Sequence, residues 1–81
     1  MDIDNLIKMA NQIGSFYDSL PDPDEASREI SGHIKKFWAP RMRIQLLDFV
    51  EQEDGAGLSP IVLASIRANI DKLQPDASYR V

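Results

Sequence analysis

The five prolines of the 81-residue chain leave four stretches that are each long enough for one short helix. Proline suits the first turn of a helix, but it removes a hydrogen bond from a helix interior and disfavours helical geometry in the residue before it. Pro23, Pro40 and Pro60 therefore predict helix starts, and Pro75 predicts a helix end. These proline positions are compatible with several short helices and exclude one long helix.

Between the prolines, apolar residues recur at spacings of three and four, which is the period of an amphipathic helix. Asp22 and Ser59 stand where helix N-caps are favoured. No segment has the alternating period of a strand. The sequence therefore predicts an all-α fold, a small compact bundle of about four short helices, with one domain over residues 1–73 and a C-terminal tail over 74–81. The expected helices cover residues 2–19, 23–38, 40–52 and 60–73.

The first predicted helix has more apolar surface than one small core needs. Its apolar side chains cover an arc of about 180°, whereas an amphipathic surface helix needs little more than about 100°. Ala10 and Gly14 form a strip of small residues on which another helix could pack closely. A domain of this size gains only ~3–5 kcal/mol from its core. We therefore expect marginal stability or self-association of the isolated chain, and a gain from binding a partner.

The residue types limit the chemistry that this chain can perform. It has no cysteine and one histidine, His33, so a thiolate metal site and a multi-histidine site are excluded. His33 lacks the context of a nucleophile and is expected at a helix surface or boundary. The acidic run before Gly55 lacks calcium-loop spacing, and the glycines form no phosphate-binding motif. We expect no catalytic, cofactor-binding or metal-binding residue, and no enzyme activity of its own.

Charge and hydropathy restrict the surroundings and the partners. The formal net charge of −4 disfavours nucleic acid. The acidic N-terminus does not resemble a signal peptide, and no apolar run is long enough for a membrane span. Without cysteine, a soluble cytoplasmic protein with no membrane contact is expected. A basic stripe is either a solvated helix face or a surface for an acidic partner; it comprises Arg28, Lys35, Lys36, Arg41 and Arg43.

The segment 37–42 is the densest feature of the chain. Two adjacent aromatic residues on a helix point about 100° apart, so Phe37 and Trp38 cannot both easily face one small core. Trp38 either plugs the corner before Pro40 or anchors a partner, since Trp, Met and Arg are enriched at interface centres. We expect Phe37 in the core and Trp38 partly exposed. The candidate partner interface comprises Lys35, Lys36, Phe37, Trp38, Pro40, Arg41, Met42 and Arg43.

One short motif offers an alternative function. The triplet 18–20, Asp-Ser-Leu, resembles the site at which acyl carrier proteins, also acidic helical domains of this size, attach phosphopantetheine to serine. In those proteins the serine opens the second helix after a long loop. Here Ser19 closes the first predicted helix and Pro21 follows, which makes the carrier reading the weaker one.

Three stretches of the chain resemble the delta subunit of the NAD-dependent, molybdenum-containing formate dehydrogenases. They are residues 4–14, 32–43 and 57–62. The middle stretch is the most specific, because it contains His-Ile-x-x-Phe-Trp-x-Pro-Arg-Met. The resemblance extends from Asp4 to about Leu73, and the tail after Gln74 has no counterpart.

The resemblance implies a non-catalytic accessory subunit that binds no cofactor itself. In such complexes a large alpha subunit carries molybdopterin guanine dinucleotide and most iron–sulfur clusters. A beta–gamma pair carries FMN and reacts with NAD. The delta subunit is associated with the maturation or stability of the alpha subunit, which is therefore the expected partner. The alternative is a dissociable chaperone that delivers or protects the molybdenum cofactor and then leaves.

Overall fold

Five helices account for most of the chain from residue 2 to residue 76, which is the part that the structure, a computed structural model, describes. They are α1 (Ile3–Tyr17), α2 (Pro23–Phe37), α3 (Pro40–Glu53), α4 (Pro60–Ala68) and α5 (Ile70–Leu73). No strand occurs in this range, so the predicted all-α fold is confirmed. Of the predicted tail, residues 74–76 are not helical and residues 77–81 lie outside the described residues.

The helix starts follow the sequence signals. Pro23, Pro40 and Pro60 are each the first residue of a helix, as their fixed φ favours. The Asp22 carboxylate accepts a hydrogen bond from the backbone N–H of Asp24 at 3.0 Å, which satisfies one of the free donors at the start of α2. The Ser59 side chain makes no such capping bond, although Ser59 precedes α4 as predicted.

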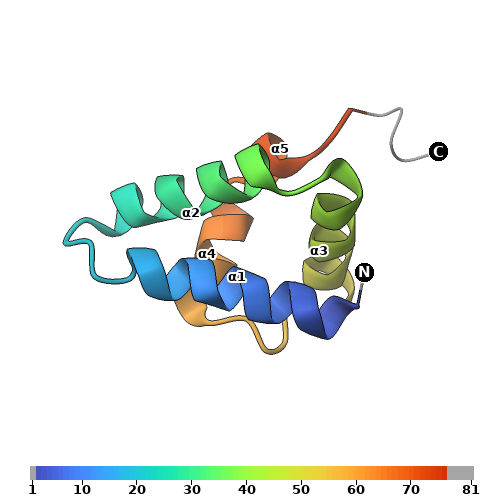
Figure 1. Ribbon diagram of the computed structural model, residues 1–81, viewed down its shortest axis with the longest axis horizontal. Helices are drawn as coiled ribbons and strands as arrows, with labels where there is room; N and C mark the ends of the chain where they lie inside the picture. Colours follow the sequence, from blue (N-terminus) through green and yellow to red (C-terminus); the bar gives the residue numbers. More distant parts are fainter. Residues whose placement is uncertain (1, 77–81) are drawn as a thin grey trace.

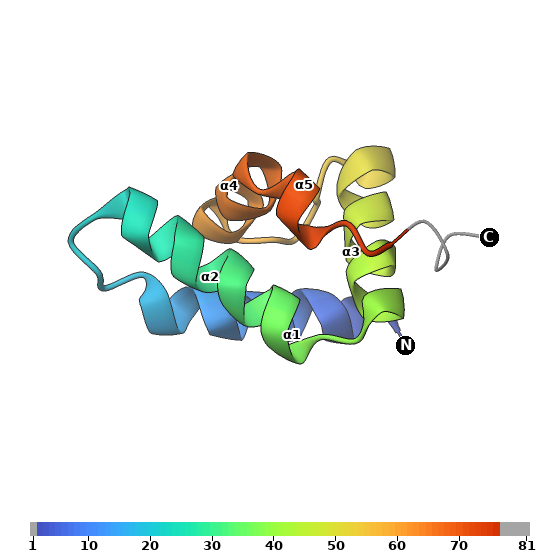
Figure 2. The ribbon, with the colours of Figure 1, turned by 90° about the horizontal axis from the view of Figure 1, so that it is seen from above.

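Helices α1 and α2 run antiparallel and side by side, joined by a short loop at one end of the molecule (Figure 1). Helix α3 stands across their other end. Helices α4 and α5 lie together on one side of the α1–α2 pair, which the view from above makes clear (Figure 2). In the part of the chain that the structure describes, no helix covers the opposite side of this pair.

The core lies where the five helices meet, and every helix contributes to it. The residues with no more than 1% of their surface exposed include Leu6, Ile30, Ile34, Leu46, Val62, Ile66 and Leu73. Where two of them share a helix, as Ile30 and Ile34 or Val62 and Ile66 do, they are four residues apart, as the sequence pattern predicted. The predicted helix positions and the apolar face of each helix are therefore largely correct.

Helix α1 is held closely against α4 and the loop before it. Gly14 is buried, and a Cβ atom added there would overlap Cγ2 of Val62. The Asn11 side chain donates to the Gly57 carbonyl at 3.0 Å and accepts from the Ser59 N–H at 2.9 Å. The strip of small residues predicted on the first helix is thus used within this chain, with α4 as the neighbouring helix.

The prediction of one helix over residues 60–73 is wrong, because the helix is interrupted at Asn69. The backbone of Asn69 has φ −128° and ψ 27°, outside the helical range. Its side-chain amide donates to the Ser65 carbonyl at 2.8 Å and to the Ser27 hydroxyl at 3.2 Å. Asparagine side chains compete in this way with the helical hydrogen bonds of the backbone. The interruption turns α5 so that Leu73 is buried in the core.

Candidate interaction surface

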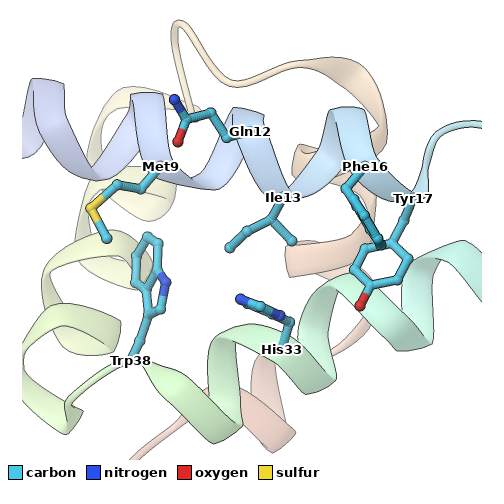
Figure 3. Close-up of a pocket in the computed structure, with 7 residues that line it drawn as sticks. All are labelled: Met9, Gln12, Ile13, Phe16, Tyr17, His33 and Trp38. Atoms are coloured by element: carbon cyan, nitrogen blue, oxygen red, sulfur yellow. The ribbon is translucent and has the colours of Figure 1, made fainter.

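An apolar groove lies between α1 and α2, and α4 lies behind it in the view of Figure 3. It has a volume of about 470 Å³, within the range of protein binding clefts. Its walls are mainly apolar, with Gln12, the Tyr17 hydroxyl, His33 and the Trp38 indole N–H as the polar groups. The residues that line it are Met9, Gln12, Ile13, Phe16, Tyr17, His33 and Trp38.

The wide apolar arc of α1 is the reason for this groove. One part of the arc, with Leu6 and Ala10, is fully buried in the core. The other part turns toward the groove, where Met9 and Ile13 are partly buried and Phe16 is 75% exposed. The predicted surplus of apolar surface on the first helix is therefore present, and it forms one wall of the groove.

Trp38 and Phe37 are arranged in the reverse of the prediction. Trp38 is buried, with 6% of its surface exposed, whereas Phe37 is 67% exposed. The helix ends at Phe37, and Trp38 has an extended backbone with φ −89° and ψ 135°. The 100° spacing of a helix therefore no longer directs the Trp38 side chain, and the indole lies between α1 and α2 (Figure 3). The alternative that Trp38 plugs the corner after α2 is the correct one.

Two exposed aromatic side chains stand on opposite helices near the groove. Phe16 on α1 contacts Tyr17 edge-to-face, with the ring centroids 4.9 Å apart. Phe37 on α2 lies against His33, with 4.7 Å between the ring centroids. The Lys36 ammonium is 5.6 Å from the centroid of the Phe37 ring, within cation–π distance. His33 is partly buried, which agrees with the expected boundary position.

The predicted interface residues have different environments in the structure. Lys35, Lys36 and Arg41 are exposed, while Pro40 is partly buried. Met42 packs against the core cluster. A terminal nitrogen of Arg43 donates to the Leu73 carbonyl at 3.3 Å, so this side chain ties α3 to the end of α5. That these residues contact a partner stays a prediction, with Trp38 and Arg43 already engaged inside the domain.

Sequence reasoning missed the α1 wall of the groove as a candidate site. Met9, Ile13 and Phe16 belong to the wide apolar arc of the first predicted helix, but the arc does not set them apart as a site, and nothing in the sequence singles out Gln12. The width of that arc was the available signal, because part of it had to remain outside the core. The second wall comes from α2, and the sequence alone did not show that these two helices leave one side open.

Residues 2–76 contain neither a metal-binding cluster of side chains nor a helix that could span a membrane. No group of three or more His, Asp or Glu side chains in this range could hold a metal ion. No helix formed by these residues has the length and apolar character needed to cross a membrane.

The fold and the groove define a small helical-bundle protein that presents an apolar surface to solvent. Comparison with protein families gives a match over residues 5–66 to the family described as NADH-dependant formate dehydrogenase delta subunit FdsD. The match covers more than half of the chain, and the chain belongs to this family. It includes the three stretches that carried the resemblance, except for Asp4. Neither the curated proteins nor the solved structures gave a match.

Proposed function

We propose that this chain is a non-catalytic accessory subunit of a cytoplasmic, NAD-dependent formate dehydrogenase. It binds the molybdenum-containing alpha subunit and supports its assembly, cofactor maturation or stability. The family match over residues 5–66 is the observation that carries this proposal. In the complete enzyme the beta and gamma subunits join the same hetero-oligomer.

The surface of the chain supports a role in binding another protein. Phe16 and Phe37 are both more than half exposed. Phe16 lines a groove with mainly apolar walls, and Phe37 lies against His33, which also lines it. Exposed apolar patches on small soluble proteins commonly mark interaction sites. A partner bound to the native state also raises its stability, by about 2.7 kcal/mol at a hundredfold excess over Kd. A single small domain gains proportionally more from such binding than a large one.

The residue types support placing the cofactors on the other subunits. Iron–sulfur clusters are held mainly by cysteine thiolates, and this chain has no cysteine. In the proposed complex, molybdopterin guanine dinucleotide, the iron–sulfur clusters and FMN belong to the partner subunits, which also react with NAD. This chain then acts through protein contacts alone.

Co-expression with the alpha subunit tests the proposal. Tagged alpha subunit should retain this chain in a fixed stoichiometric ratio through gel filtration. Omitting this chain should lower the molybdenum content or the thermal stability of the purified alpha subunit. A chain that never co-purifies, with unchanged alpha subunit in its absence, would refute the proposal. Transient retention by immature alpha subunit alone would instead support the dissociable chaperone.

A further inference from the structure

The groove between α1 and α2 is long enough to bind a short helix. On its α1 wall, Met9 and Phe16 are seven residues apart, which corresponds to ~10.5 Å along the helix. A helix that binds in a groove places anchors at positions i, i+3 or i+4, and i+7, which also span ~10.5 Å. The two walls are antiparallel helices, and a helix bound between them can pack its side-chain ridges into the grooves of theirs.

The charges beside the groove are predominantly positive. A second hollow shares Tyr17 and His33 with the groove, and its lining includes Arg28, Lys36 and the single carboxylate Glu29. Lys8, exposed on α1, lies one turn before Gln12. The charged residues that line this second hollow are net positive, although the whole chain carries −4. A partner that presents carboxylates beside its apolar anchors therefore complements it.

We propose that this groove receives an amphipathic helix of the alpha subunit, with apolar anchors packed between Met9, Phe16 and His33 and with carboxylates directed toward Lys36 and Arg28. The inference rests on the proposed function and names the docking surface and the chemistry of its ligand. Phe37 and Lys36, which contact each other, form the edge at which apolar and charged contacts meet. A second copy docked groove to groove would instead bring two positive edges together.

Matched variants of exposed residues test this surface. Phe16→Ser with Phe37→Ser removes the two exposed aromatic side chains, and Ile70→Ser removes an apolar side chain that is 39% exposed on α5. Lys36→Glu with Arg28→Glu reverses the charged edge, and Lys72→Glu reverses a cation on α5. Each purified variant is titrated against immobilised alpha subunit at two salt concentrations, after its helical content has been checked by circular dichroism.

The double substitution Phe16→Ser, Phe37→Ser should raise Kd by at least about 30-fold. A loss of 2 kcal/mol marks an interface hot spot, and each 1.4 kcal/mol corresponds to a tenfold change in Kd. The charge reversal should slow association and reduce its dependence on salt. Both α5 variants should bind like the wild type. If the aromatic variant loses its helical content, the charge reversal alone decides the outcome, because both of its residues are exposed.

The partner segment is identified independently by cross-linking. A photoreactive benzoylphenylalanine in place of Gln12 should cross-link the alpha subunit within a helix rich in Asp and Glu. A cross-link to a basic or non-helical segment overturns the inference.

The remaining outcomes separate the two proposals. Wild-type binding that the groove variants leave unchanged overturns the groove and retains the accessory function. Groove variants that abolish only self-association in sedimentation assign the groove to a second copy and overturn the inference. A wild-type chain that never binds the alpha subunit removes both proposals.

Discussion

Replacing Trp38 by alanine removes a side chain that joins the end of α2 to the core. Trp38 is 94% buried and belongs to the core cluster that includes Leu6 and Leu46. Truncation of a buried tryptophan or phenylalanine to alanine costs ~3–5 kcal/mol. At ~0.05–0.15 kcal/mol per residue, a chain of this length has a total stability of roughly 4–12 kcal/mol. We therefore expect Trp38→Ala to remove a large fraction of the stability, or all of it.

The neighbouring residue provides the matched control. Phe37 is also aromatic and only one position away, but it is 67% exposed. Phe37→Ala should therefore change the free energy of unfolding by no more than about 0.5 kcal/mol, as surface substitutions usually do. Urea denaturation followed by circular dichroism measures both variants. Equal losses for the two substitutions, or a loss below about 1 kcal/mol for Trp38→Ala, would refute the assignment of Trp38 to the core.

Fluorescence gives a second measure of the same assignment, because Trp38 is the only tryptophan. A buried indole emits at short wavelength, so the free protein should already show blue-shifted emission that partner binding changes little. Emission from the free protein at the wavelength of a water-exposed indole would contradict the burial. The measurement does not depend on the stability of any variant.

Three further substitutions test other contacts. Gly14→Ala should lower stability by ~1–3 kcal/mol, because its Cβ would overlap Val62. Gly32→Ala, with open space around it, should instead raise stability by up to ~1 kcal/mol. Thermal melts of both variants test this, and equal effects would contradict the close packing of α1 on α4. Asn11→Ala should lower the free energy of unfolding by ~1–3 kcal/mol, since it leaves the Ser59 N–H without its hydrogen-bond partner. The Ser59 amide should then exchange its hydrogen faster, and unchanged protection would contradict this role of Asn11. Ser19, exposed in the turn after α1, should stay unmodified after co-expression with a phosphopantetheinyl transferase; an added prosthetic-group mass would support the carrier alternative.

The parts of the fold that depend on local backbone restrictions were predictable from the sequence. Pro23, Pro40 and Pro60 set helix starts because the proline ring fixes φ within its own residue. The break at Asn69 was not predictable in this way. One of its two side-chain hydrogen bonds goes to Ser27 on α2, so the break depends on contacts between helices that the local pattern does not contain.

The reversal of Phe37 and Trp38 has a related cause. Helical spacing assigns directions only while the backbone stays helical, and Trp38 is the first residue beyond α2. A shift of the helix end by one residue decided which aromatic ring entered the core. Helix ends are the least certain feature of any reading from periodicity. The candidate interface, which was centred on these residues, was therefore placed partly on side chains that stabilise the domain itself.

In the proposed complex, folding and binding use different parts of the same helix, which makes them separable by mutation. Leu6, Ala10 and Gly14 repeat every four residues and face the core or α4. Met9 and Phe16, seven residues apart, face the groove. Substitutions in the first set should lower the stability of the free chain and reduce partner binding only in proportion to unfolding. Substitution of exposed Phe16 should leave the free chain folded and act on binding directly. A wide apolar arc on one helix can thus serve a core and a docking surface together, because the neighbouring helix α2 leaves one side of the pair uncovered.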